Sequence, residues 1–123
     1  MTGFSETSEN ALEKTFYGRV PLQGAAALLY FTKQGKTQQL IHLLKYKGKQ
    51  QIGFWAGNYL GHLMVEANRF EFIDAIVPVP LHPKKLKKRG YNQVIRFGRQ
   101  LATVLELPFH EELLQRIGHA ETQ

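Results

Sequence analysis

Residues 77–93, "VPVPLHPKKLKKRGYNQ", combine side-chain types and spacing that suit the binding of an anion. Three prolines stiffen the stretch, which lowers the entropy lost when side chains are fixed around a ligand. Arginine can bind two phosphate oxygens at once, whereas lysine supplies a mobile point charge. Five cations stand close together here: Lys84, Lys85, Lys87, Lys88 and Arg89. The pattern predicts a phosphate-binding loop over residues 81–93.

Two other interpretations of the basic stretch stay open. One is a charge run on a solvated turn that binds nothing. The other is a nucleic-acid-binding module, in which the cations at 84–89 contact a single-stranded DNA backbone and the adjacent tyrosine stacks on a base. The sequence carries no helix-turn-helix, zinc-finger or RNA-recognition signature.

The composition limits the possible functions. The chain of 123 residues has 16 Lys and Arg against 10 Asp and Glu, and the net charge of +6 favours anionic partners. It contains no cysteine, so disulfides and thiolate metal sites are excluded within this chain. No apolar run approaches the roughly 18 residues of a membrane span, and residues 1–14 lack the features of a secretory signal. We therefore expect a soluble, cytoplasmic protein.

Candidate catalytic groups are few. Asp74 is the only aspartate, so a mechanism that needs two aspartates around a metal or a ribose cannot be completed with these residues. The histidines show no metal-ligand spacing, and there is no nucleophile–base arrangement or P-loop. Glu111 and Glu112 are interpreted as a solvated helix face and not as a catalytic pair. The sequence therefore predicts no metal site.

Apolar periodicity indicates the elements that must position the basic stretch. Short apolar runs bounded by turn signals predict strands at residues 24–32 and 72–80. Three- and four-residue apolar spacing predicts helices in four stretches: residues 10–17, 37–47, 50–67 and 92–105. Thr37 and Asn92 are the expected caps of the second and fourth helices.

Residues 50–67 give the clearest helical pattern. Apolar and aromatic side chains form one stripe with the 3.6-residue period over about five turns. We interpret this stripe, with its aromatic side chains, as core and not as a ligand site. Its members are Ile52, Trp55, Ala56, Tyr59, Leu60, Leu63, Met64 and Ala67.

Residues 76–106 form one predicted unit of buried strand, basic loop and helix. In α/β sheets, ligands bind beyond the carboxyl ends of the strands, where loops lead into helices. The helix N-terminus offers unpaired N–H groups and a partial positive charge. Gly90 stands just before it and lets the backbone approach an oxygen closely.

At these residues the chain resembles the ComF/GntX family of phosphoribosyltransferase-like proteins. The stretch "VPVPLHPKKLKKRGYNQ" is similar to the family's V-P-V-P-L-H-P-x-R-x-x-x-R-G-[FY]-N-Q signature. "LIHLLKYKGK" at residues 40–49 is similar to its L-I-x-x-x-K-Y-x-G block, at the right distance upstream. The resemblance covers roughly residues 15–123.

The resemblance implies a type I phosphoribosyltransferase fold, whose loop receives the pyrophosphate of phosphoribosyl pyrophosphate (PRPP). By position it assigns PRPP or phosphate binding to Lys85, Arg89, Gly90, Tyr91, Asn92 and Gln93. The resemblance also assigns to Lys45 a possible contact with the ligand, made from the small accessory subdomain (the hood, residues 22–71) that precedes the core. PRPP binding should depend sharply on Arg89 and Gly90. It should depend little on Lys84 or Lys88, whereas nucleic-acid binding should weaken by similar steps for each cation removed.

The same resemblance implies a bacterial protein of competence, meaning DNA uptake. Its expected partners are PRPP with Mg²⁺, single-stranded DNA and other competence proteins. Family members also carry a cysteine-rich zinc module and an acidic D-D-x-x-T-T-G type segment, and this sequence has neither. We therefore expect the N-terminal part of a longer glycosyltransferase, inactive by itself.

The expected fold class is α/β. We divide it into an N-terminal segment (residues 1–21), a small hood of helices and a strand (22–71), and the first strand–loop–helix of a phosphoribosyltransferase-like parallel sheet (72–123). Such a truncated sheet leaves core surface exposed, through which a homo-oligomer could form.

Overall fold

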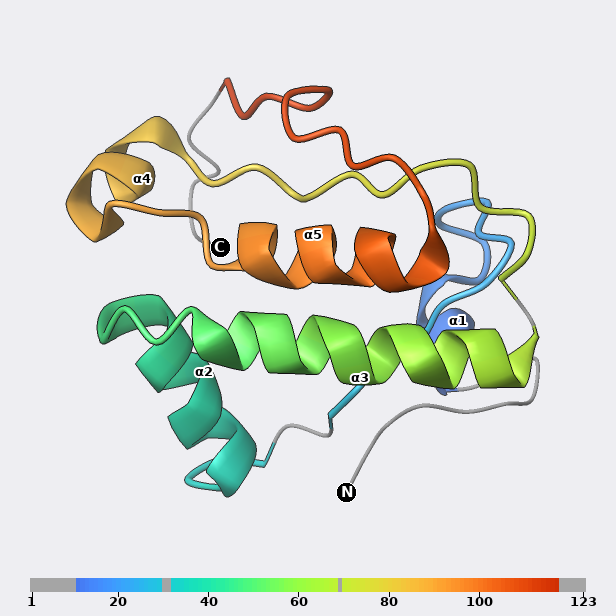
Figure 1. The fold of residues 1–123 in the computed structure, drawn as a ribbon, viewed down its shortest axis with the longest axis horizontal. Helices are drawn as coiled ribbons and strands as arrows, with labels where there is room; N and C mark the ends of the chain where they lie inside the picture. The colour runs from blue at the N-terminus through green and yellow to red at the C-terminus, as the bar shows by residue number, and fades with distance from the viewer. Residues whose placement is uncertain (1–10, 30–31, 69, 118–123) are drawn as a thin grey trace.

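The computed structural model describes residues 11–29, 32–68 and 70–117, which form helices joined by extended segments (Figure 1). The helices are α1 (Ala11–Phe16), α2 (Lys36–Tyr46), α3 (Gln51–Ala67), α4 (Pro83–Arg89) and α5 (Val94–Leu105). The four helices predicted from periodicity are confirmed, whereas α4 was not predicted. Across these ranges no helix has both the length and the apolar character that crossing a membrane requires.

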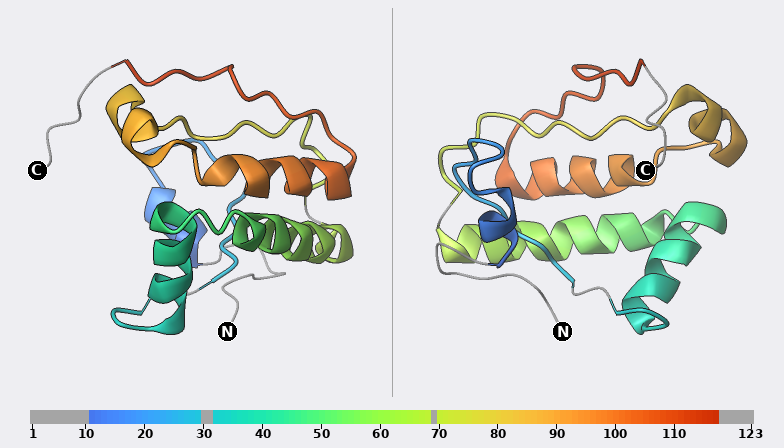
Figure 2. Two further views of the ribbon diagram at one scale, coloured as in Figure 1. Left: turned by 60° about the vertical axis from the view of Figure 1, so that its left-hand side comes forward. Right: turned by 180° about the vertical axis from the view of Figure 1, so that it is seen from behind.

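The predicted α/β fold with a parallel sheet is wrong, because the described residues form no strand. Residues 24–29 are neither helix nor strand, and residues 30–31 of the first predicted strand lie outside the description. Residues 72–80 are extended and run beside residues 107–117 (Figure 2). Between these two segments there is an isolated parallel bridge, from Ile76 to Phe109.

Proline stops this pairing from growing into a ladder. The N–H of Ile76 donates to the carbonyl of Pro108, and the N–H of His110 donates to the carbonyl of Ile76, each at 3.0 Å. The next donor on the same side of a parallel ladder would belong to residue 78, which is a proline and has no N–H. Pro80 repeats the gap. The residues that stiffen the stretch therefore also prevent the predicted strand.

α3 and α5 run parallel and in contact along their length (Figure 1). The contact face of α3 carries Gly53, Gly57 and Gly61, one helical turn apart. A Cβ atom at Gly57 would lie 2.3 Å from the carbonyl oxygen of Phe97, and one at Gly61 would lie 2.8 Å from Cβ of Val104. We call these three residues the glycine face. Larger side chains there would hold the two helices apart.

The glycine face also explains why part of the predicted core stripe is wrong. The buried cluster of the core consists of Leu60, Met64 and Leu101, beside the helix contact. Trp55 and Tyr59, predicted as core, are 55% and 40% exposed. They stand about half a turn around α3 from the glycine face. Because α5 packs where α3 has no side chains, the aromatic side of α3 stays open.

Two predicted helix caps had different outcomes. Asn92 makes the predicted capping bond, since its side-chain oxygen accepts a hydrogen bond from the N–H of Val94 at 3.3 Å, although the N-cap position itself is held by Gln93, one residue later. Thr37 is wrong, because Gly35 is the N-cap of α2 and Thr37 lies inside the helix. Glu111 and Glu112, predicted on a helix face, lie in a segment of residues 107–117 without a helix.

Candidate anion-binding site

The basic stretch, predicted as a loop, folds in part into α4. The ring of His82 begins this helix by accepting a hydrogen bond at Nδ1 from the N–H of Lys84, at 3.2 Å. Pro83 occupies the first turn, where a missing N–H costs little. Gly90 ends the helix with a φ of 86°, and its N–H donates to the carbonyl of Leu86 at 2.7 Å. Local sequence therefore specifies both ends.

The helical period sorts the cations of α4 into two groups. At 3.6 residues per turn, Lys85, Lys88 and Arg89 share one side of the helix. Lys84 and Lys87 lie on another. The first group lines a cavity, and the second does not.

The link between α4 and α5 is fastened at two points. The hydroxyl of Tyr91 donates to the carbonyl of Leu44, which lies 47 residues earlier in the last turn of α2. The side-chain N–H of Asn92 donates to the carbonyl of Val79 at 3.1 Å, while the oxygen caps α5. The first bond holds the basic stretch against α2, and the second holds it against the proline segment.

Between the C-terminal end of α2 and one side of α4 lies a cavity of about 540 Å³, which we call the basic cleft. None of the described residues that line it is acidic. Five cations therefore face one space without a neutralising carboxylate, which favours an anionic ligand. The lining residues are Lys45, Tyr46, Lys47, Gly48, Lys85, Lys88, Arg89 and Tyr91.

The guanidinium of Arg89 is held on two sides. Its Nη1 donates to Oε1 of Gln93, and the group lies over the ring of Tyr46, with 5.5 Å from Cζ to the ring centroid. A guanidinium stacked on an aromatic ring keeps its edge N–H groups available for an acceptor. The contact also joins the two sequence motifs, because Tyr46 belongs to the upstream one.

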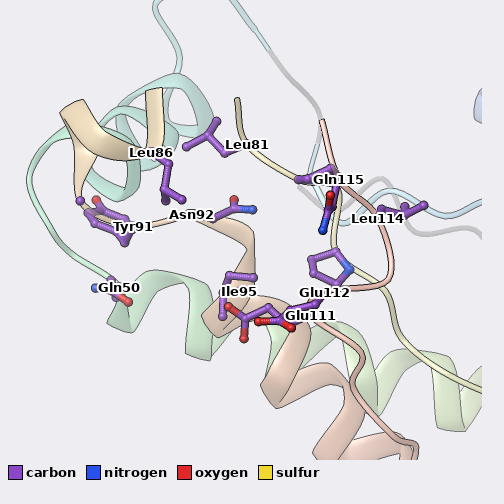
Figure 3. Close-up of a pocket in the computed structure, with 13 residues that line it drawn as sticks. Gln50, Leu81, Leu86, Tyr91, Asn92, Ile95, Glu111, Glu112, Leu114 and Gln115 are labelled. Carbon is purple, nitrogen blue, oxygen red and sulfur yellow. The ribbon is translucent and has the colours of Figure 1, made fainter. Parts of the chain in front are cut away.

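The structure brings some of the residues predicted to bind PRPP together and separates others. Four of the predicted residues line the basic cleft: Lys45, Lys85, Arg89 and Tyr91. Gly90 and Asn92 instead line a second cavity, which Tyr91 also borders (Figure 3). Gln93 bonds to Arg89 and supports it.

Sequence reasoning missed four residues of the basic cleft: Tyr46, Lys47, Gly48 and Lys88. Tyr46 and Lys47 lie in the upstream motif beside the predicted Lys45. Lys88 was expected to contribute little, but it lines the cleft with Arg89. Helical spacing from Lys85 would have identified Lys88, had the stretch been predicted as a helix.

The basic cleft does not fit a resident magnesium ion. Mg²⁺ prefers carboxylate and water oxygens, and no described residue of the cleft carries a carboxylate. Elsewhere in residues 11–29, 32–68 and 70–117 there is no group of three or more His, Cys, Asp or Glu side chains that could hold a metal ion.

Comparison with known proteins gives one informative relationship. The chain is 31% identical over 90 residues to competence protein F of Haemophilus influenzae, a match that covers 68% of this chain and 39% of that protein. The likeness supports a ComF-like family. This chain thus matches well under half the length of that relative. No protein-family model matches the chain, and no solved structure matches it significantly.

Proposed function

We propose that this chain is the phosphate-binding part of a ComF-like protein with a competence-related role, and that the basic cleft binds the pyrophosphate group of PRPP. The likeness to competence protein F supports the competence-related role. The observation that carries the binding is the convergence of five cations, from α2 and α4, on one cavity whose described lining is free of acid.

The chemistry of the cleft suits a polyanion with several oxygens. The lysines supply point charges from two directions, and Arg89 supplies a planar group that can bind two oxygens at once. Tyr46 and Gln93 hold that group in place, which lowers the entropy lost on binding. Among the described residues that line this space there is no nucleophile–base pair and no carboxylate, so the activity that we propose for this chain is binding and not transfer.

Isothermal titration of pyrophosphate and of PRPP into the chain, with Mg²⁺ in the buffer, tests the proposal. We expect Arg89→Ala to weaken both affinities about tenfold or more, because it removes charge-assisted hydrogen bonds. Arg89→Lys keeps the charge and should recover only part of the loss. Lys87→Ala is the matched control, since Lys87 lies on α4 but does not line the cleft. It should change the affinities by less than about twofold.

Two results would contradict the proposal. If the folded chain binds neither ligand, the basic cleft is not a phosphate site. If Lys87→Ala weakens binding as much as Arg89→Ala, the effect comes from overall charge and not from the cleft.

Single-stranded nucleic acid is a second candidate ligand, favoured by the open side of α3. The rings of Trp55 and Tyr59 stack on each other, with 5.6 Å between centroids and 8° between planes, while both stay exposed. Exposed aromatic rings near cations are typical of single-strand binding, where bases stack on them. Lys45 borders the apolar groove beside Trp55 as well as the basic cleft, so the two features adjoin.

The single tryptophan gives a direct test of this candidate. A short oligo(dT) should quench the fluorescence of Trp55 if its bases stack there. The affinity should also fall steeply with salt, and by similar steps for each lysine removed. Unchanged fluorescence at saturating oligonucleotide would exclude stacking on α3.

A further inference from the structure

A second cavity of about 560 Å³ adjoins the basic cleft, and Tyr91 borders both. Its walls come from the proline segment, from the link between α4 and α5, and from residues 111–115 (Figure 3). We call it the polar cavity. Two residues that the resemblance assigns to phosphate binding, Gly90 and Asn92, line this cavity and not the basic cleft, so the chemistry of the cavity decides what they can bind.

The two adjoining cavities have opposite charge. The basic cleft is lined by five cations, whereas the polar cavity is lined by Glu111 and Glu112 and by no Lys or Arg among the described residues. An anionic group is therefore stabilised in the cleft and destabilised in the polar cavity. A group that donates hydrogen bonds and carries positive charge is favoured in the polar cavity for the same reason.

Glu112 is the carboxylate of the polar cavity that is best placed to meet a ligand. The carboxylate of Glu111 is engaged with Arg99, with Oε2 at 2.6 Å from Nη2. Glu112 forms no ion pair within the described part of the chain. An ionised carboxylate only accepts hydrogen bonds, so its natural partner is a donor such as an ammonium group.

The rest of the cavity suits a small organic ligand. Figure 3 shows the amides of Asn92 and Gln115 around the same space as the two carboxylates. Leu86 and Ile95 add apolar surface. Pockets for small molecules combine apolar walls with a few polar groups in this way.

We propose that the polar cavity binds the protonated amine of a small ligand whose phosphate group occupies the basic cleft. Glu112 is then the residue that determines specificity for the amine. This inference rests on the proposed phosphate site and adds a second ligand class beside it.

A matched pair of ligands tests the inference at pH 7. Glucosamine 6-phosphate and glucose 6-phosphate differ in one group, an amine in place of a hydroxyl, and share the phosphate. Titration into the chain should give about fivefold tighter binding of the amine, as a charge-assisted hydrogen bond to an exposed carboxylate allows. Glu112→Gln should abolish that preference and leave glucose 6-phosphate binding within about twofold. Glu66→Gln, on α3 and outside both cavities, is the control for the loss of one negative charge.

The outcomes separate the two proposals. Equal binding of the two sugars, with dependence on Arg89, overturns the amine site and leaves the phosphate site standing. A preference that survives in Glu112→Gln also overturns the assignment. If neither sugar phosphate nor pyrophosphate binds, the phosphate site fails, and the amine site fails with it.

Discussion

The contact between α3 and α5 and the basic cleft are built on opposite principles. Along the glycine face, side chains are absent, and the two backbones approach until a single Cβ would clash. At the basic cleft, long cationic side chains line an open space, and hydrogen bonds and an aromatic stack hold its walls together.

The difference shows where this chain tolerates change. Close packing leaves no room for an added atom at Gly57 and Gly61, so the helix contact depends on these two positions staying small, while Gly53 is close but less restricted. The cleft depends on a few directional bonds between distant segments. Its lysines can therefore be exchanged without loss of the fold. Removal of the Tyr91–Leu44 hydrogen bond or of the stack between Arg89 and Tyr46 would instead change the shape of the cleft.

The largest effect is expected for Gly57→Val, which tests the close contact between α3 and α5. The added side chain would meet the backbone of Phe97, which cannot move aside without separating the helices. We expect a loss of about 3 kcal/mol in the free energy of unfolding, as for overpacked cores. Urea denaturation followed by circular dichroism measures it.

Ala56→Val is the matched control for that change. Ala56 is adjacent on α3 but borders the apolar groove beside α2, where there is space. Its cost should be only the lower helix propensity of valine, about 0.7 kcal/mol or less. Equal losses for the two variants would show that α3 does not depend on close approach at Gly57.

Asn92 should give an intermediate effect, because it makes two separable bonds. Asn92→Ala removes the cap of α5 and the tie to Val79, and we expect a loss of about 1–2 kcal/mol in unfolding free energy. Asn92→Asp keeps the acceptor for the cap and removes only the donor to Val79. It should lose roughly half as much. If both variants lose the same amount, the cap contributes nothing measurable, because Asn92→Asp retains it.

The smallest effect on stability is expected for Tyr91→Phe, which tests the hydrogen bond that holds the walls of the basic cleft together. It removes one hydrogen bond, to the carbonyl of Leu44, and should cost about 1 kcal/mol. Pyrophosphate binding should weaken as well, because Lys45 is no longer held opposite α4. Tyr59→Phe is the control, since that ring is exposed on α3. A loss of stability with unchanged pyrophosphate affinity would separate the bond from the cleft.

The sequence predicted four of the helices because their apolar periodicity and boundary residues act locally. Asn92 was identifiable as a cap for the same reason. The strands were not predictable in this way, because a strand needs a partner, and the prolines that looked like boundary signals removed the donors such a partner requires.

The chemistry of the site was predicted better than its geometry. Cations at residues 84–89 and a motif at residues 40–49 indicated an anion site, and Lys45, Lys85 and Arg89 do line one cavity. Which lysines face the cavity depends on α4. That helix was not predicted, because its sequence is almost entirely basic and shows no apolar periodicity. The exposure of Trp55 could not be read from periodicity, since a helix with both an aromatic side and a glycine side offers two candidate contact faces.

The glycine face has a consequence for the order in which the chain folds. Each glycine inside a helix costs about 1 kcal/mol relative to alanine, so three of them leave α3 unable to persist as an isolated helix. α3 therefore gains its helical structure when it docks on α5, which has a single glycine, Gly98, and so forms a helix more readily. α3 and α5 thus become ordered in one cooperative event, and the basic cleft, whose walls on α2 and α4 directly precede these two helices in the chain, is complete only when that event has occurred.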